Sequence, residues 1–343
     1  MTLASVHRRL EKLHQQSRIA AGSLIVSVFG DAVLPRGGGV WLGSLIGLMK
    51  TLGVNERLVR TTVFRLVKDD WLQTETQGRR ANYRLTPVGL RRFDDAARHI
   101  YAAQTPAWDQ RWRFLLLVGE LAPREREALR RALRWQGFGE LASGHFLHPG
   151  ADLSEAMDAL AADGLGAMLP QLMPLVATQP PLSPAASHAD LVGRAWNVAQ
   201  LARGYCAFVA DYHPLLQELQ SLQGPAAVAC QGGGHQGQNG PGNAAGATDF
   251  AANGINPEAA FQARSLMIHD FRRLLLQDPE LPTDLLPPQW PGEAARQLCA
   301  ELYARLLPPS EAYLDARLQL ASGDVPPARP MLGQRFAPAV QRS

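Results

Sequence analysis

The sequence predicts a mixed α+β fold that is mainly helical and has more than one domain. The chain has 343 residues, of which 46% are apolar, and this is enough to bury two or three cores. Long segments with helical patterns alternate with short β-favouring runs near residues 71–86 and 111–147. Stretches rich in Pro or Gly separate these segments and mark the expected boundaries.

Residues 55–70 predict an amphipathic helix with one strongly basic face. Val59, Val63, Leu66 and Val67 form its apolar stripe, and Asn55 suits the N-cap. The opposite face combines four cations with a hydroxyl group and an aromatic ring: Arg57, Arg60, Thr61, Phe64, Arg65 and Lys68. Such a face fits the major groove of DNA, where Arg and Lys reach phosphates and guanine edges. An ordinary surface helix with solvated charges is the alternative.

Two further helices are predicted before the basic helix. Residues 23–34 form an apolar segment that stops at Pro35 and three glycines, and we interpret it as a buried helix. Residues 43–52 predict a second helix that Gly53 closes, directly before the basic helix. Residues 1–16 predict only a short, frayed amphipathic segment.

A hairpin and a closing helix are predicted after the basic helix. Residues 71–76 and 81–86 are β-favouring runs around a turn that carries Arg79 and Arg80, placed to reach a phosphate backbone or the minor groove. Thr86 and Pro87 are an N-cap and first residue for a helix through Ile100. Three helices followed by a basic hairpin predict a winged helix-turn-helix DNA-binding domain over residues 18–103.

The charge is distributed unevenly along the chain. Residues 1–99 contain 16 Lys and Arg against 8 Asp and Glu, whereas the remainder contains 18 against 23. This asymmetry favours a front part that binds a polyanion. No run of about 18 uncharged apolar residues predicts a membrane span. The three separated cysteines, Cys206, Cys230 and Cys299, fit a reducing compartment, so a cytoplasmic location is expected.

Residues 106–184 predict a small second domain. Its segments predict two strands and two helices in alternation: residues 111–118, 123–135, 138–147 and 154–162. Pro123 and Gly137 suit the two ends of the first of these helices. Alternating strands and helices of this length predict one α+β layer.

Residues 189–320 predict a helical C-terminal domain after a Pro-rich linker at residues 179–184. The expected helices cover four segments: residues 189–222, 257–277, 292–307 and 310–320. Residues 224–254 are rich in Gly, Ala, Asn and Gln and predict a flexible insertion. Residues 322–343 predict a disordered tail.

The sequence contains no motif of a known catalytic or metal site. A Gly-rich phosphate loop, a GxSxG elbow, an HExxH pair and zinc-type Cys/His spacing are all missing. His145 and His148 are three apart, so on a strand they face opposite sides. We therefore expect no enzyme activity, no metal and no cofactor.

Several motifs together resemble the PaaX family, repressors of bacterial phenylacetate degradation. They are SLIVSVFGDAVLPRGGGVWLGSLIGLM, NERLVRTTVFRLVKDDWL, GRRANYRLTPVG, GFGELASGHFLHP and HDFRRLLLQDPELPTDLLPPQWPGEAAR, in this order. The resemblance implies a winged-helix head, a ferredoxin-like middle domain similar to Cas2, and a helical C-terminal domain. It also implies a homodimeric repressor that binds a palindromic, double-stranded operator and is released by phenylacetyl-CoA. The insertion at residues 224–254 departs from the family pattern.

Effector-binding residues are expected in the segment around residue 270. An aryl-acyl-CoA combines an aromatic group with phosphates, so basic and aromatic side chains should converge on it. The candidates are His269, Arg272, Arg273 and Trp290. Helix packing and solvated charge are the alternative interpretation of this segment.

Two other functions remain open from the sequence. A Cas2-like middle domain could belong to a nuclease or RNA-processing protein, although Asp109 alone gives thin support for a Mg²⁺ site. An architectural DNA-binding dimer without a ligand is the other alternative. It predicts operator affinity that no acyl-CoA changes.

Overall fold

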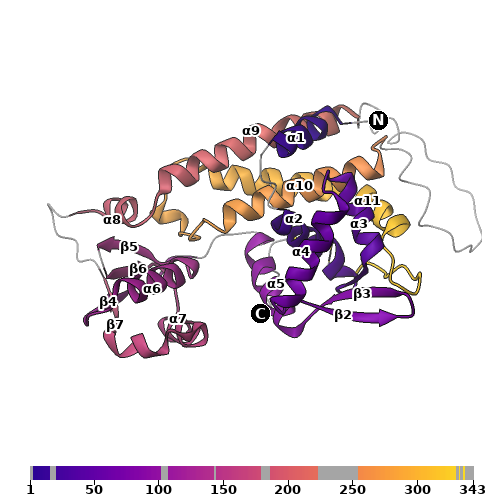
Figure 1. The fold of residues 1–343 in the computed structure, drawn as a ribbon. Helices are drawn as coiled ribbons and strands as arrows, with labels where there is room; N and C mark the ends of the chain where they lie inside the picture. The colour runs from indigo at the N-terminus through magenta and orange to yellow at the C-terminus, as the bar shows by residue number, and fades with distance from the viewer. Residues whose placement is uncertain are drawn as a thin grey trace, which may run out of the picture. The chain divides into compact units, whose positions relative to one another are not determined.

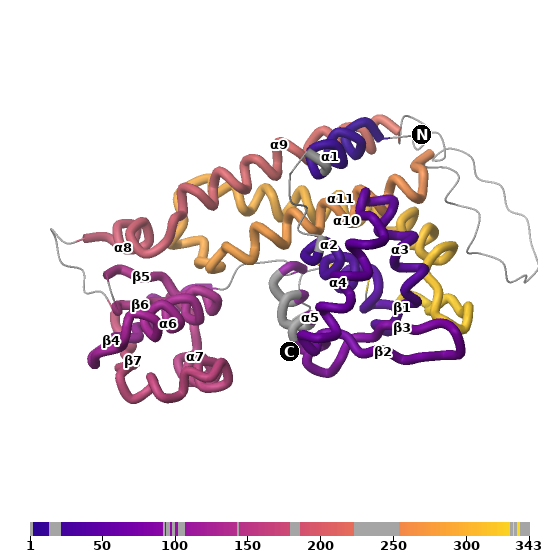
Figure 2. The backbone as a smooth tube through the Cα atoms, viewed as in Figure 1, coloured from indigo at the N-terminus to yellow at the C-terminus, as the bar shows by residue number. Residues whose placement is uncertain are grey.

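The computed structural model describes residues 3–15, 21–101, 107–142, 144–178, 186–222, 254–329, 332 and 335–336. The chain divides into two compact units (Figures 1 and 2). The first unit contains residues 1–102, 207–272 and 295–343, and the second contains residues 103–206 and 273–294. Three of the four boundaries fall inside helices: α9 (Val198–Leu222), α10 (Pro257–Leu275) and α11 (Pro291–Arg317).

Residues 21–100, here called the head, begin with three helices. The first, α2 (Ala21–Val28), continues through a π-helical turn and a 3-10 turn as far as Arg36. It is followed by α3 (Leu42–Thr51) and α4 (Glu56–Lys68). The three predicted helices are confirmed. The first is apolar on most sides because Leu24, Ile25, Val28 and Phe29 are all buried.

A small antiparallel sheet completes the head. The hairpin of β2 (Leu72–Gln77) and β3 (Arg80–Leu85) is confirmed, and β1 (Gly39–Trp41) pairs with β3 on its other edge. Gly78 has a φ of +60° in the hairpin turn, a conformation that suits glycine. The last helix of the head, α5 (Pro87–Ile100), begins as predicted at Thr86, whose side chain accepts a hydrogen bond from the Gly89 amide.

The core of the head includes residues from the C-terminal helices. Val59 and Val63 of α4 are buried, as predicted, while Leu66 and Val67 are half-buried at the margin. The same apolar cluster contains side chains of α10, of the end of α11 and of the residue directly after it: Phe261, Leu266, Tyr313, Leu314 and Leu318. The head therefore does not bury its apolar side by itself.

The N-terminal helix α1 (Ala4–Gln15) is docked, so the prediction of a frayed segment is wrong for residues 3–15. Leu3, Val6 and Leu13 are buried. The Arg9 guanidinium makes two hydrogen bonds of 2.6 Å to the Asp270 carboxylate on α10. A bidentate pair of this kind fixes orientation as well as position. The partner of Arg9 lies on α10, far along the chain, so the local sequence cannot reveal this pair.

The C-terminal end also differs from the prediction. Residues 292–307 and 310–320 were expected to form two helices, but α11 continues across Pro308 and Pro309. Directly after them, Ser310 and Glu311 bond to Arg264 at 3.1 and 2.6 Å, and these contacts anchor the helix where the prolines remove donors.

The predicted disorder of residues 322–343 is wrong for the residues described there. The Arg329 amide donates to the Pro35 carbonyl at 2.9 Å, the Pro326 carbonyl accepts from Arg36 at 3.0 Å, and Leu332 is buried. These contacts, all with distant parts of the chain or with its core, hold the segment against the head.

The second unit has a four-stranded antiparallel sheet. Its elements follow the order β-α-β-β-α-β: β4 (Trp112–Leu117), α6 (Pro123–Trp135), β5 (Gly139–Ala142), β6 (His145–His148), α7 (Leu153–Leu160) and β7 (Leu172–Ala177). The spatial order is β5-β6-β4-β7, which is the ferredoxin-like arrangement. The predicted α+β layer is confirmed.

Two details of this sheet were predicted incorrectly. Residues 138–147 were expected to form one strand, but they contain the hairpin β5–β6, in which Gly144 has a φ of +91°. Strand β7 was not predicted at all. It contains Pro174, which is compatible with a strand only at a sheet edge or bulge, and β7 is an edge strand.

One face of the sheet packs on α6 and α7, and the other packs on a second apolar cluster. That cluster joins Trp112 and Leu147 of the sheet with Val192 of α8 (His188–Ala195) and with Leu281 and Leu285 near a 3-10 turn. The helical prediction for residues 189–222 is thus resolved into α8 and α9. The whole of the predicted linker and all but one residue of the predicted insertion lie outside the described residues.

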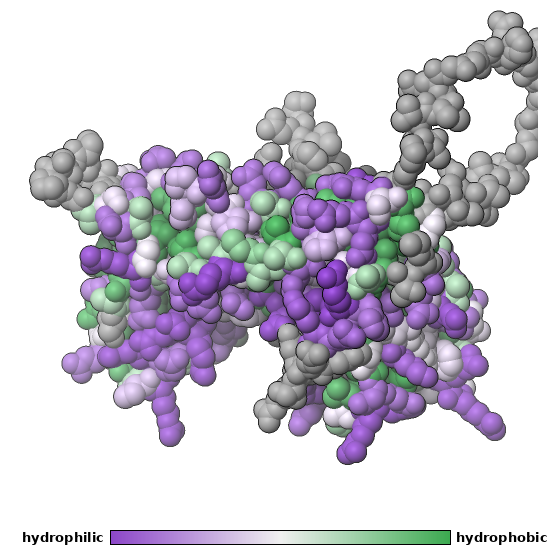
Figure 3. Space-filling view, turned by 90° about the horizontal axis from the view of Figure 1, so that it is seen from above, coloured by the Kyte–Doolittle hydropathy of each residue, from purple (hydrophilic) through white to green (hydrophobic). Residues whose placement is uncertain are grey.

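On the face seen from above in Figure 3, green hydrophobic areas alternate with purple hydrophilic ones. Within the described ranges, no helix is both long and apolar enough to cross a membrane.

Candidate nucleic-acid interface

Helix α4 presents all six of its predicted DNA-binding side chains to solvent. These exposed residues are Arg57, Arg60, Thr61, Phe64, Arg65 and Lys68. Phe64 is 73% exposed, which is unusual for a large aromatic side chain. The N-cap is formed as predicted, because the Asn55 side chain accepts a hydrogen bond from the Leu58 amide at 2.9 Å. The structure therefore combines a cationic outer face with an anchored inner face on one helix.

Two residues of this face make contacts within α4. Arg60 donates to Glu56 at 2.8 Å, one turn earlier, and both side chains are more than half exposed. An exposed pair of this kind contributes little free energy, so Arg60 can exchange Glu56 for a phosphate or a base. The Thr61 hydroxyl donates to the Arg57 carbonyl at 2.9 Å, which leaves its lone pairs and methyl group outward.

Arg65 lies at the edge of the face, beside the start of α2. An ideal Cβ atom placed on Gly22 would be 3.0 Å from Arg65 Nη2. The absence of a side chain at Gly22 therefore gives the guanidinium its space. This proximity leaves the Arg65 side chain less freedom than a fully solvated arginine has.

The hairpin adds two more cations with different surroundings. Arg79 is exposed in the turn, as predicted. Arg80 is the first residue of β3, and its guanidinium carbon lies 4.5 Å from the centre of the Trp41 ring. Such a cation–π contact orders the arginine without neutralising it. Sequence analysis missed Trp41, although an aromatic residue in a three-residue strand beside a basic hairpin was a usable signal.

The four candidate effector residues are divided between the two units. His269 is buried on α10, and its Nδ1 atom is 3.1 Å from the Ser27 hydroxyl of α2. Arg272 donates to the Ser23 hydroxyl at 3.2 Å, and burial lowers the pKa of its guanidinium. These two residues therefore meet α2 in the first unit.

The other two candidates belong to the second unit. Arg273 is exposed on α10. Trp290 packs edge-on against Tyr205, with ring centres 5.9 Å apart. Arg273 is thus open to solvent, whereas Trp290 is packed against another aromatic ring.

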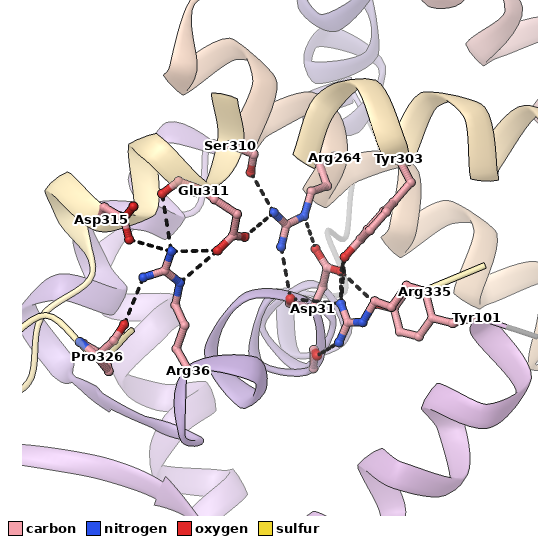
Figure 4. A network of polar contacts seen from close by, with 11 residues as sticks. Asp31, Arg36, Tyr101, Arg264, Tyr303, Ser310, Glu311, Asp315, Pro326 and Arg335 are labelled. Atoms are coloured by element: carbon pink, nitrogen blue, oxygen red, sulfur yellow. Dashed lines mark hydrogen bonds and ion pairs between the residues drawn. The ribbon is translucent and has the colours of Figure 1, made fainter. Parts of the chain in front are cut away.

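A buried network of charges centres on Asp31, which sequence analysis did not single out (Figure 4). Arg264 of α10 donates to Asp31 at 2.6 Å, Arg335 donates at 2.7 Å, and the hydroxyl groups of Tyr101 and Tyr303 donate at 2.7 and 3.1 Å. A single acid inside the apolar segment 23–34 was the signal available in the sequence.

The network extends from Asp31 to a second carboxylate. Arg264 also donates to Glu311 at 2.6 Å, and Glu311 accepts from Arg36 at 2.7 Å. Although burial alone would raise it, the charges of Arg264 and Arg335 hold the pKa of Asp31 below its ordinary value. The buried acid is thus ionised and paired, as buried charges must be.

Asp109, the one carboxylate considered for a Mg²⁺ site, is paired with an arginine in the second unit. Both oxygens of Asp109 accept hydrogen bonds from Arg113, at 2.6 and 2.7 Å, and this pairing lowers the pKa of Asp109 to about 2. His148 Nδ1 accepts from the amides of Gly150 and Ala151. In the part of the chain that the structure describes, no three His, Cys, Asp or Glu side chains are grouped so as to hold a metal.

Comparisons with known proteins identify three successive segments. Residues 20–89 match the family model of PaaX-like protein, residues 105–172 match the PaaX protein central Cas2-like domain, and residues 246–316 match the PaaX-like protein C-terminal domain. The chain is 35% identical over 323 residues to the transcriptional repressor PaaX of Escherichia coli (strain K12), covering 93% of this chain and 90% of that protein. The match to the central domain agrees with the ferredoxin-like sheet.

Among solved structures, the uncharacterized protein Rv0674 from Mycobacterium tuberculosis is similar at 23% sequence identity. The match covers 79% of this chain and 89% of that chain, with a TM-score of 0.43. A score this low supports no functional conclusion.

The family models and the curated relative define the class of protein as a DNA-binding transcription regulator and not an enzyme. The chain belongs to the PaaX family of transcriptional repressors. The sequence resemblance to this family is thereby confirmed.

Proposed function

We propose that the head is a winged helix-turn-helix that binds operator DNA, with α4 in the major groove and the β2–β3 hairpin as the wing. The exposed basic face of α4, turned away from the core, carries this proposal. Its cations can reach phosphates and guanine edges, and Phe64 can contact a thymine methyl group. Arg79 and Arg80 on the wing are suited to the phosphate backbone or the minor groove.

We also propose that the repressor controls genes of phenylacetate catabolism and is released by an aryl-acyl-CoA such as phenylacetyl-CoA. Membership in the PaaX family supports this assignment. His269 and Arg272 are the stronger effector candidates, because both bond to α2 of the head. A ligand that binds them differently in two states would change the contact with α2 and hence the operator affinity. A homodimer on a palindromic operator is part of this proposal.

The DNA proposal is tested by a duplex selected from a random-sequence pool with the wild-type protein. Replacing Arg60 or Arg65 with Ala should weaken binding to the selected duplex by about 1–3 kcal/mol if the residue contacts a base. Arg131→Ala, at an exposed position of α6 in the second unit, is the matched control and should leave affinity unchanged. Failure to enrich any duplex, or equal effects of the control, would contradict the proposal.

The wing is tested by the salt dependence of binding. Arg79→Ala should lower the slope of log K against log salt by about one, because one phosphate contact is lost. An unchanged slope would place the wing away from the DNA.

The effector proposal is tested by titrating the protein–duplex complex with a panel of CoA thioesters. Phenylacetyl-CoA or a close relative should release the duplex, whereas acetyl-CoA and free CoA should not. Arg272→Ala should weaken this response more than it weakens DNA binding. An affinity that no thioester changes would support the architectural alternative instead.

A further inference from the structure

The segment that follows α11 is hydrogen-bonded to the β1–β3 strand pair. The Trp41 amide of β1 donates to the Gln319 carbonyl at 2.9 Å. The Ala321 amide donates to the Asn82 side-chain oxygen on β3 at 2.6 Å. Trp41 and Asn82 are opposite each other in the β1–β3 ladder. Alternate residues of the C-terminal segment therefore bind both members of one cross-strand pair.

Ser44, near the start of α3, ties the same segment from a second side. Its hydroxyl donates to the Arg317 carbonyl at 2.6 Å and accepts from the Gln319 amide at 3.0 Å. Ser44 and Asn82 are 7% and 8% exposed, so water cannot easily replace these hydrogen bonds. Leu318, which lies between Arg317 and Gln319 in the sequence, is fully buried in the core of the head.

Trp41 connects this segment to a proposed DNA contact. The Arg80 guanidinium lies over the Trp41 ring at 4.5 Å. An ideal Cβ atom on Gly43 would lie only 2.5 Å from the ring, so the ring lies directly against Gly43. The ring position is therefore set by the local backbone, and that backbone is bonded to Gln319.

We propose that residues 317–321 form a latch that positions Arg80 for contact with DNA, with Ser44 and Asn82 as its positioning residues. The proposal rests on the DNA-binding function of the head and adds a route by which that function is controlled. Because α11 runs directly into the latch, a displacement of this helix changes the support of the wing.

A double-mutant cycle on the full chain tests the latch with the selected duplex. Arg80→Ala alone should weaken binding roughly fivefold, which corresponds to about 1 kcal/mol. Ser44→Ala should weaken binding by a similar factor and should remove most of the additional effect of Arg80→Ala. The matched cycle uses Arg57→Ala on α4, whose effect should multiply with that of Ser44→Ala. Ser44→Thr keeps the hydroxyl group and should restore the coupling.

Independent effects of Ser44→Ala and Arg80→Ala in a folded protein would overturn the latch while leaving the DNA-binding proposal intact. If Arg57→Ala and Arg80→Ala are both without effect, the DNA-binding proposal fails as well. Thermal melting identifies variants that do not fold, and Asn82→Ala then replaces Ser44→Ala in the cycle. Hydrogen exchange on the wild-type protein is independent of any variant: fast exchange of the Trp41 and Ala321 amides would overturn the latch.

Discussion

Asp31 determines how the head joins the C-terminal helices at the scale of a single residue. Its carboxylate is buried and accepts from two arginines and two tyrosines that come from four other places in the sequence. A buried charge with this many partners is tolerated only while all of them remain in place. Burial of Asp31 is therefore favourable only when the parts of the first unit that supply these partners are correctly assembled.

Replacing Asp31 with Asn should destabilise the protein by about 3–5 kcal/mol, because a neutral amide no longer balances the positive charges of Arg264 and Arg335. Chemical unfolding of the wild type and the variant measures the difference. Asp315→Asn is the matched control: Asp315 also pairs with an arginine, Arg36, but is 61% exposed, so its loss should cost less than about 1 kcal/mol. Equal costs for the two variants would contradict the role assigned to Asp31.

His148 makes the second unit sensitive to acid. Burial, with a smaller contribution from the nearby charge of Arg113, lowers the pKa of His148 to about 4. In the unfolded chain His148 has a pKa near 6.5. Between about pH 6.5 and pH 4 the residue is therefore protonated in the unfolded chain but neutral in the folded chain. The free energy of unfolding is therefore unaffected by this proton above about pH 6.5, and it decreases as the pH falls towards 4.

The free energy of unfolding should consequently decrease by up to about 3 kcal/mol between pH 6.5 and pH 4 through this residue. His148→Asn keeps an acceptor for the Gly150 and Ala151 amides but does not titrate there. Its unfolding free energy should depend less on pH in this window. Parallel pH profiles for the two proteins would show that His148 is not the cause.

At the scale of elements, α4 depends on its N-cap residue, Asn55, for a defined start. Asn55→Ala should cost about 1 kcal/mol, because the Leu58 amide loses its acceptor. Asn55→Asp keeps an acceptor and should retain the stability, as thermal melting can verify. A larger loss for Asp than for Ala would contradict the capping role.

Elements with local signals could be predicted from the sequence, and elements that depend on distant contacts could not. Asn55, Thr86 and Pro123 mark helix starts through their own chemistry, and all three helices begin there. Strand β7 forms only because β4 offers an edge, and α11 passes two prolines where Arg264 and Arg36 hold it.

The same distinction applies to the candidate site. The exposed face of α4 follows from helical periodicity and could be predicted. The support of Arg80 by Trp41 and the separate surroundings of Arg272 and Trp290 depend on the tertiary fold.

At the scale of the whole molecule, the predicted boundary at residue 103 does not coincide with a complete core. The first unit combines the head with parts of α9, α10 and α11. Leu314 and Leu318 are fully buried in the same cluster as Leu24 and Val59. Removing the C-terminal helices would expose this apolar surface and leave Asp31 without Arg264.

A fragment of residues 18–103 should therefore fail to fold cooperatively, whereas a fragment that also carries residues 255–336 through a linker should recover part of the structure. Circular dichroism during thermal unfolding distinguishes the two. A sharp transition in the short fragment, together with binding of the selected duplex, would show that the head is autonomous.

The shared core also limits how this architecture can be recombined. Many regulators evolve, and are engineered, by grafting a DNA-reading module onto a foreign sensor. Here the head packs on five apolar side chains from the C-terminal part of the chain, and its buried Asp31 is paired with two arginines from that same part. A working chimera would have to inherit the end of α11 with the head, so new specificities should arise by changing the exposed face of α4 rather than by exchanging whole domains.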